Sequence, residues 1–183
     1  MKYIDIVDDK NNLIGEKVDL TEVFKNGLWH REVSVFVVNN QGEVLLQKRS
    51  NTKRRKPNMW TVCSGVVEAD EDVISAAMRK LHNELVMKCT IYDLELIEIG
   101  IESNQLENER NNNFRYIYFI KTDRKIEDYP INPEEISKLK YISIEELGRL
   151  IDEKDPNVTF SNQQYMEVVY KQLEKRINEI KEK

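Results

Sequence analysis

The sequence predicts an α/β fold in which helices flank a mixed β-sheet, with a strand annex at the N-terminus and a long helix at the C-terminus. Three observations predict this class. Short β-branched segments are separated by polar turns, a helical stripe of apolar residues spans residues 71–86, and a second stripe closes the chain. Strands and helices in this order pack as helices against a sheet. A chain of 183 residues is long enough for one domain with a proper core.

The first half of the chain contains most of the expected strands. We expect strands at residues 2–7, 13–18, 33–38, 44–48 and 59–63, and helices at residues 21–26 and 71–86. The turn at residues 39–42 has the chemistry of a hairpin loop between two β-branched arms. Asp70 or Glu71 lies near the start of the second helix, where an acidic group suits the positive end of the helix dipole.

The second half is expected to add three strands and two helices. The strands lie at residues 94–101, 114–121 and 138–144, the polar residues 102–113 form a loop, and helices span residues 143–151 and 162–182. Ser143 and Glu146 resemble a capping box for the first of these helices. The last helix carries an apolar stripe of Tyr165, Val169, Leu173, Ile177 and Ile180. This stripe packs either on the parent domain or against a second copy, so a homodimer is one predicted assembly.

Composition and charge exclude several classes of protein. A formal net charge of −5 gives no overall attraction to nucleic acid. No apolar run approaches the roughly 20 residues of a membrane span, and the N-terminus becomes acidic before any apolar stretch, so no secretory signal is expected. The two cysteines, Cys63 and Cys89, are expected to be reduced thiols. The sequence therefore predicts a cytoplasmic protein without a nucleic acid or membrane partner.

Residues 65–87 contain the most informative spacing in the chain. Five residues separate Gly65 from Glu71, seven more separate Glu71 from Arg79, and Glu84 follows. This spacing resembles the Nudix box, G-x5-E-x7-R-E-U-x-E-E-x-G-U, in which U is a bulky aliphatic residue. The matches are Gly65, Glu71, Arg79, Leu81, Glu84 and Met87, and the departures are Lys80, Asn83 and Val86. The resemblance implies a Nudix fold, an α/β/α sandwich, over residues 29–155, with the annex at 1–28 and the C-terminal helix within 156–183.

The resemblance implies a hydrolase that cleaves a diphosphate linkage in a small anionic metabolite. Cleavage requires charge neutralisation at the phosphoryl oxygens and a positioned water, and Mg²⁺ or Mn²⁺ held by carboxylates provides both. The family pattern implies that Glu84 and Glu71 hold the ion together with the backbone oxygen of Ser64. It also implies that Arg79 orients a box glutamate. Glu84, Glu71 and Arg79 are thus the candidate catalytic residues.

The chemistry of the box is reduced on one helix face. Positions 80, 83 and 84 are neighbours on that face because residues three and four apart lie side by side. They are Lys80, Asn83 and Glu84, so one carboxylate remains and Lys80 comes within hydrogen-bonding range of it. A cluster of several metal ions is not expected there, and the general base is unassigned.

Much of the chain resembles the isopentenyl-diphosphate-isomerase-like branch of the Nudix family. The matching segments are Trp29 with His30, residues 40–42, 46–49, 57–61 and 79–85. The isomerases use a cysteine directly before the box glycine, where this chain has Ser64, with Cys63 one place earlier. A shift by one residue turns a strand side chain to the opposite face. Val66 also replaces the histidine expected after the glycine, so isomerase activity is disfavoured.

The isomerases further require a glutamate on a later strand. The acid-x-acid pair Glu107 and Glu109 is expected too early in the sequence, in the loop before that strand. His30 matches a metal ligand of the family, but a structural role is expected for it in the absence of a partner histidine.

A basic loop precedes the box in this acidic chain. Six basic residues fall within nine positions: Lys48, Arg49, Lys53, Arg54, Arg55 and Lys56. Such a loop suits an anionic substrate through charge and forked guanidinium hydrogen bonds, whereas the alternative is a solvated surface loop. We predict Lys48, Arg49 and Lys53 as substrate-binding residues and rank Arg54 and Arg55 behind them.

Three functional hypotheses follow. The first is a Nudix-type hydrolase that uses a divalent metal. The second is a non-catalytic Nudix-fold module that binds diphosphate ligands, with Lys80 offsetting Glu84 in the space of a metal. The third is an isopentenyl-diphosphate isomerase. The missing acids favour the second hypothesis, and the basic loop fits the first two equally. The sequence places the hydrolase first.

Overall fold

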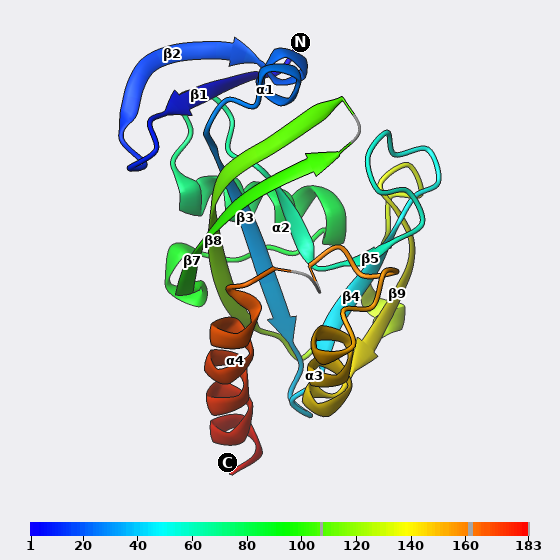
Figure 1. Cartoon of the computed structure of the whole chain (residues 1–183). Coiled ribbons are helices and arrows are strands. Elements are labelled where there is room, and N and C mark those ends of the chain that lie inside the picture. Colours follow the sequence, from blue (N-terminus) through cyan, green and yellow to red (C-terminus); the bar gives the residue numbers. More distant parts are fainter. Residues whose placement is uncertain (107, 161–162, 183) are drawn as a thin grey trace.

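A seven-stranded mixed sheet forms the centre of the fold (Figure 1). The computed structural model describes residues 1–106, 108–160 and 163–182. The strands of this sheet are β3 (His30–Val38), β4 (Val44–Arg49), β5 (Trp60–Thr61), β6 (Cys63–Val66), β7 (Glu95–Leu106), β8 (Glu109–Lys121) and β9 (Ile136–Ile142). β3 and β8 run parallel, and β3 also pairs with β6 in antiparallel orientation.

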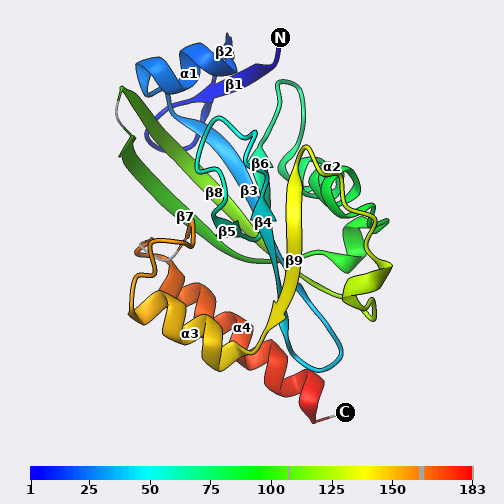
Figure 2. The ribbon, with the colours of Figure 1, turned by 90° about the vertical axis from the view of Figure 1, so that its right-hand side faces the viewer.

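Helices cover both faces of the sheet (Figure 2). α2 (Val73–Leu85) packs on one face, and α3 (Ile144–Asp152) and α4 (Met166–Lys181) pack on the other. Two short 3-10 helices, η1 (Ile91–Asp93) and η2 (Ile126–Asp128), lie in connections. This arrangement confirms the predicted mixed sheet between helices.

Side chains of β3 alternate between the two faces of the sheet, and this alternation decides which of them enter each core and which line a cavity. Val33, Val35 and Val37 belong to the core under α2, whereas Phe36 belongs to the core under α3 and α4. Because successive strand residues point to opposite faces, Glu32 shares the face of Phe36. α3 and α4 cover the Phe36 end of this face. Glu32, at the other end, lines a cavity.

The N-terminal annex is a separate two-stranded sheet with one helix. β1 (Tyr3–Val7) and β2 (Leu13–Asp19) pair in antiparallel orientation, and α1 (Leu20–Asn26) follows. Ile4, Ile6 and Val23 form a small core against which Val66 of β6 packs. These elements confirm the predicted strands and helix, and they bring the annex against the start of the box.

The prediction of a loop over residues 102–113 was wrong. Residues 95–106 and 109–121 form one long hairpin, and Glu102 pairs in register with Asn113. The outer part of this hairpin is polar because it extends beyond the helical layers toward α1 (Figure 1). There Asn112 Nδ2 donates a hydrogen bond of 2.7 Å to the backbone oxygen of Gly27. The polar sequence therefore belongs to a hairpin that supports the annex, and three of its polar residues are buried: Glu102, Asn111 and Asn113.

Two predicted helix starts are corrected. α2 begins at Val73 rather than at residue 71, because the side chain of Asp72 caps it by accepting a hydrogen bond of 2.8 Å from the backbone N–H of Ser75. α4 begins at Met166, and residues 161 and 162 of the predicted helix lie outside the described residues. The Ser143 half of the predicted capping box of α3 is confirmed, because its side chain accepts from the backbone N–H of Glu146, whereas the Glu146 side chain pairs with Arg149.

The apolar stripe of α4 packs on the chain's own sheet. Val169, Leu173 and Ile177 are fully buried in the core beside Phe36. The stripe is therefore already covered, and it supplies no argument for a second copy. In the described part of the chain, no helix combines the length and the apolar character required to cross a membrane.

We expect Leu173→Ala to lower the free energy of unfolding by about 2–5 kcal/mol, because it leaves a cavity in a fully buried site. Val168→Ala on the exposed side of the same helix is the matched control, with an expected change within about 0.5 kcal/mol. Urea unfolding of both variants measures this. Equal losses would mean that the helix does not pack as described.

Candidate functional site

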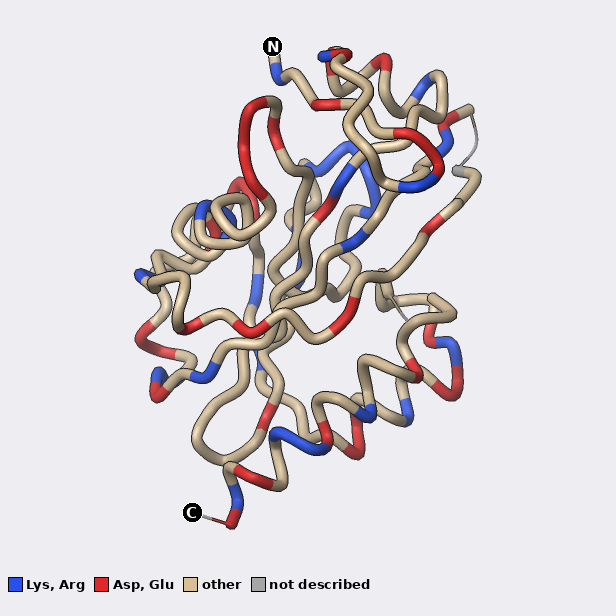
Figure 3. Tube along the Cα trace, turned by 90° about the vertical axis from the view of Figure 1, so that its left-hand side faces the viewer, with Lys and Arg blue, Asp and Glu red and all other residues tan. Residues whose placement is uncertain are grey.

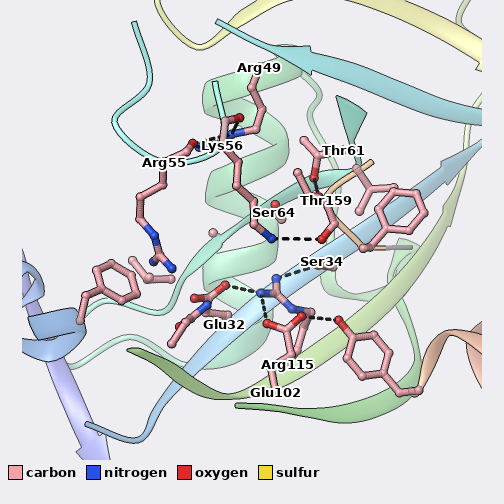
Figure 4. Close-up of a pocket in the computed structure, with 17 residues that line it drawn as sticks. Glu32, Ser34, Arg49, Arg55, Lys56, Thr61, Ser64, Glu102, Arg115 and Thr159 are labelled. Atoms are coloured by element: carbon pink, nitrogen blue, oxygen red, sulfur yellow. Dashed lines mark hydrogen bonds and ion pairs between the residues drawn. The ribbon is translucent and has the colours of Figure 1, made fainter. Parts of the chain in front are cut away.

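A cavity of about 240 Å³ lies between the sheet, the basic loop and the annex (Figure 4). It is bordered by the start of the box, since Ser64, Gly65 and Val66 are among its lining residues. The other lining residues are Phe24, Glu32, Ser34, Arg49, Arg55, Lys56, Thr61, Val62, Glu102, Asn111, Arg115, Thr159, Phe160 and Tyr165. The cavity thus combines four basic side chains with two carboxylates.

One end of the cavity is formed by the basic loop between β4 and β5. Figure 3 shows the Lys and Arg residues of this loop as a blue run on the trace. The Arg49 guanidinium is used within the loop itself. It donates to the backbone oxygens of Arg55 (2.9 Å) and Lys56 (3.1 Å), which fixes the loop. Arg49 is therefore the residue that positions its two neighbours at the cavity.

Arg55 and Lys56 are the loop cations with unused capacity. The Arg55 guanidinium lies 3.9 Å from the centre of the Phe24 ring in the annex. Lys56 Nζ donates to the backbone oxygen of Thr159 at 3.2 Å, and among the described ion pairs none includes Lys56. Burial lowers the pKa of this ammonium. A partly buried cation that takes part in none of the described ion pairs favours an anionic ligand.

The floor of the cavity is a buried ionic network on three adjacent strands (Figure 4). Arg115 Nη2 on β8 contacts Glu32 Oε2 on β3 at 2.5 Å and Glu102 Oε2 on β7 at 2.8 Å. Arg115 Nη1 also donates to Ser34 Oγ at 3.1 Å, and Tyr165 Oη donates to Glu102 Oε1 at 2.8 Å. The three charged side chains are 5–12% exposed, so the network is largely desolvated.

The charges in this network determine its ionisation. Burial alone raises the pKa of Glu102, but the charge of Arg115 and hydrogen bonds from Arg115 and Asn113 outweigh it and hold that pKa below its usual value. The pKa of Glu32 is lowered in the same way: burial opposes the shift, and Arg115 and His30 cause it. Both carboxylates are therefore ionised at neutral pH.

The structural half of the box is intact. Glu71 and Arg79 form a two-pronged ion pair, with both N···O distances at 2.7 Å. Arg79 also donates to the backbone oxygen of Val66 at 3.0 Å, and Glu71 accepts from the backbone N–H of Glu68 at 3.0 Å. These contacts tie the loop before α2 to β6. Arg79 orients a box glutamate, as predicted, and that glutamate is Glu71.

Glu84 is buried between two partners of its own. Its Oε1 pairs with Lys80 Nζ, and its Oε2 accepts a hydrogen bond of 2.6 Å from Gln47 Nε2. The stem of Lys80 lies against Gly65, where an added Cβ would come within 2.8 Å of it. Burial alone lowers the pKa of Lys80, but the charge of Glu84 outweighs this and raises it. The predicted Lys80–Glu84 contact is thus a buried pair held by packing.

This donor set does not fit a resident Mg²⁺ or Mn²⁺. Both ions require several open oxygen ligands, whereas each oxygen of Glu84 and Glu71 already has a hydrogen-bonding or charged partner. Within the described residues, no three His, Cys, Asp or Glu side chains come together as a metal site. Asn83 is exposed on α2. The predicted set of Glu84, Glu71 and the Ser64 backbone is not assembled in this arrangement.

The structure separates the predicted substrate-binding residues. Arg49 lines the cavity, whereas Lys48 and Lys53 do not. Lys53 Nζ instead pairs with Glu135 at 2.5 Å. The basic residues ranked lower by sequence include Arg55, which reaches the cavity.

The alternation on β6 places Cys63 and Ser64 as predicted. Ser64 lines the cavity, and Cys63 is buried on the other side in the core under α2, where burial raises the pKa of its thiol. Glu109 begins β8 and pairs with Arg54 and Arg55 at the rim of the loop. Glu107 lies outside the described residues. His30 is fully buried, with its ring nitrogens near the Leu28 oxygen and Glu32 Oε1.

Sequence reasoning missed the residues of the ionic network. The sequence predicts a loop around Glu102, and it indicates only an apolar-stripe position for Tyr165. One signal was available for β3, because Glu32 and Ser34 are polar at alternate positions of a strand whose other residues from Val33 to Val38 are apolar. Two polar residues on one face of a buried strand indicate a cavity or a buried network.

Comparisons of this chain with known proteins agree on one family. Residues 28–164 match the family described as NUDIX domain. A protein of Clostridium acetobutylicum, named as an uncharacterized Nudix hydrolase, is 33% identical over 159 residues, which covers 84% of this chain and 75% of that protein. The isopentenyl-diphosphate Delta-isomerase of Pectobacterium atrosepticum is 27% identical, covering 76% of this chain and 75% of that enzyme.

A solved structure supports the fold. The protein DR0079 of Deinococcus radiodurans superimposes with a TM-score of 0.66 at 20% identity, covering 94% of this chain and 99% of that one. The chain also matches the chloroplastic isopentenyl-diphosphate Delta-isomerase II of Arabidopsis thaliana, at 31% identity over 82% of this chain, but it spans only 58% of that enzyme's length.

We expect the ionic network to make stability depend on acid pH. The folded-state pKa of Glu102 lies below its unfolded value near 4.5, so its contribution is fully present above that pH and is lost as pH falls through the folded pKa. Glu102→Gln removes this contribution. Urea midpoints measured from pH 7 to pH 3 are therefore expected to fall less steeply for the variant. Parallel pH profiles would contradict the network.

Proposed function

This chain belongs to the Nudix domain family, and we propose that its cavity binds a small anionic metabolite that contains a diphosphate group. One observation carries the proposal: Arg55 and Lys56, two partly buried cations of the basic loop, line the same cavity in a chain whose net charge is negative. Arg49 holds the loop in place from behind. A guanidinium donates two parallel hydrogen bonds and an ammonium acts as a compact point charge. An Arg and a Lys together therefore suit the several oxygens of a diphosphate.

The partners of Glu84 favour binding without cleavage. Lys80 supplies a fixed positive charge to Glu84 where a box with a third glutamate would attract a metal ion, and Gln47 occupies the other oxygen. The sequence ranked hydrolysis first because the box spacing is retained. The geometry supports binding best, since no carboxylate of the box is free to hold an ion or to activate a water.

Hydrolysis of the diphosphate linkage with Mg²⁺ or Mn²⁺ is the second candidate. Its support is the family itself and the similarity to the Clostridium protein named as a Nudix hydrolase. It requires that Lys80 leave Glu84 when the ligand binds. Isomerase chemistry has less support, because Cys63 faces away from the cavity and Ser64 stands in its place.

Phosphorus NMR tests the proposal directly. We expect inorganic pyrophosphate and ADP-ribose to show perturbed phosphorus signals with the protein in the absence of a divalent metal, and no new phosphorus signals when Mg²⁺ or Mn²⁺ is added. Lys56→Met is expected to weaken binding at least about tenfold, which corresponds to about 1.4 kcal/mol. Lys48→Met, a loop-end lysine outside the lining, is the matched control and leaves affinity unchanged.

Two results would contradict this proposal in different ways. Metal-dependent product signals that disappear in Glu84→Gln would establish the hydrolase. Unperturbed signals for both ligands, with and without metal, would exclude the cavity as a diphosphate site.

A second prediction concerns the charge at position 80. Lys80→Glu places two carboxylates side by side and removes the cation, so we expect a lower melting temperature without metal and a rise on addition of Mn²⁺. The wild-type melting temperature is expected to be insensitive to Mn²⁺. Lys88→Glu, an exposed lysine beyond the end of α2, is the control for the added negative charge. A rise of the wild type equal to that of Lys80→Glu would show that Lys80 does not exclude the ion.

A further inference from the structure

We propose that Tyr165 is a positioning residue of the cavity, which keeps the carboxylate of Glu102 on Arg115 and so leaves Lys56 available to an anionic ligand. The inference rests on the proposed function, because Lys56 is one of the two cations assigned there to the ligand. It adds a requirement that lies outside both the basic loop and the box. In a partly desolvated cavity opposite charges attract strongly, so a cation stays available to a ligand only where the carboxylates are held elsewhere.

The two oxygens of Glu102 differ in their partners. Oε2 accepts hydrogen bonds of 2.8 Å from Arg115 Nη2 and from Asn113 Nδ2. Oε1 accepts one of 2.8 Å from Tyr165 Oη, and the described residues supply no other hydrogen-bond donor to it. The Glu102 side chain is 5% exposed, so little water reaches it. Tyr165 is therefore the contact that satisfies Oε1.

Lys56 is the cation that competes for this oxygen. Its side chain extends from the basic loop toward the ionic network (Figure 4), and both Lys56 and Glu102 line the cavity. Nζ donates to the backbone oxygen of Thr159, and none of the described ion pairs includes Lys56. Burial lowers the pKa of Lys56, and Glu102 is the largest charge that opposes this. An ammonium is a strong donor for a carboxylate oxygen, so loss of the Tyr165 hydroxyl would let Glu102 pair with Lys56.

Gly100 allows the ring of Tyr165 to reach Glu102. Gly100 lies on the same face of β7 as Glu102, because the two residues are separated by one position. The Tyr165 ring lies so close over this glycine that an added Cβ would come within 2.3 Å of the ring atom Cδ1. Tyr165 also directly precedes α4, which Val169 anchors in the core. A gap in the strand and a helix start thus bring the hydroxyl to Oε1.

The pKa of Lys56 tests the proposal without a ligand. The charged groups that act on this ammonium are two that raise its pKa and two that lower it: Glu102 and Glu32, and Arg115 and Arg55. In Tyr165→Phe the released carboxylate comes closer to the ammonium, so we expect the pKa of Lys56 to rise relative to the wild type. NMR titration of the lysine side chains measures this, and Lys56→Met assigns the signal. An unchanged pKa would overturn the proposal.

A double-mutant cycle tests the consequence for binding. We expect Tyr165→Phe to weaken the binding of inorganic pyrophosphate about tenfold in calorimetry, because the ligand then competes with Glu102 for Lys56. Glu102→Gln replaces the carboxylate by an uncharged amide. In that background we expect Tyr165→Phe to change the affinity by no more than about twofold. An equal loss in both backgrounds would mean that Tyr165 only shapes the cavity, and the proposal would fail.

Two further variants separate the hydroxyl contact from packing. Gly100→Ala pushes the ring of Tyr165 away from Glu102 without removing the hydroxyl, so we expect it to reproduce both the raised pKa and the weaker binding. Tyr170→Phe is the matched control on α4, because the Tyr170 hydroxyl lies 3.5 Å from Glu174 and outside the cavity lining. Circular dichroism checks folding. Tyr165→Phe keeps the ring and decides the question if Gly100→Ala does not fold, whereas a folded Gly100→Ala without either effect would contradict the proposal.

The outcomes separate this inference from the proposed function. A raised pKa of Lys56 in Tyr165→Phe, with no binding of pyrophosphate by the wild type, would support the positioning role and overturn the proposed function. Binding that Lys56→Met weakens and Tyr165→Phe leaves unchanged would support the proposed function and overturn the positioning role.

Discussion

The parallel pairing of β3 and β8 is the constraint on which the rest of the structure depends. The two strands stay in register over nine positions, from His30 opposite Asn113 to Val38 opposite Lys121. Parallel neighbours require a long connection, and here that connection contains α2 with the box. The same register places Glu32 beside Arg115. One pairing thus determines which face the box helix covers and where the cavity has its charged floor.

In this chain the box keeps the contacts that hold the fold together but not the carboxylates that the family's chemistry uses. The Arg79–Glu71 pair still ties the loop before α2 to Val66, and this requires only a guanidinium, a carboxylate and a carbonyl. Lys80 replaces an acid and pairs with Glu84. Such a pair on a helix surface contributes little, but this one is buried and also bonded to Gln47. Removing either Lys80 or Glu84 would leave an unpaired buried charge, so the folded state depends on both side chains.

Sequence reasoning succeeded where the deciding contact is local. The i, i+4 spacing was sufficient to place Lys80 beside Glu84, and strand alternation was sufficient to turn Cys63 away from Ser64. It failed where the contact joins distant parts of the chain. Glu102 and Tyr165 meet across 63 residues, and nothing in either local pattern indicates the other.

The basic loop shows a second limit of prediction from the sequence. Its composition indicated an anion site, but composition does not say which cations face the site. Lys56 has a positive φ of 47°, and Arg49 bonds the backbone oxygens of Arg55 and Lys56. This backbone path, rather than the number of charges, turns the last two basic residues into the cavity. Arg49, which the sequence ranks ahead of Arg55, therefore serves as the support of Arg55 and Lys56.

The presence of carboxylates in an anion-binding cavity follows from the same balance of charges. Arg115 has its charge satisfied by Glu32 and Glu102, so attraction of an anion falls to Arg55 and Lys56. The charges of Glu32 and Glu102 also act on Arg55 and Lys56, where they oppose the lowering of both pKa values by burial. The carboxylates of the sheet thus favour the charged form of the loop cations, and the strand register that holds Glu32 beside Arg115 maintains this balance.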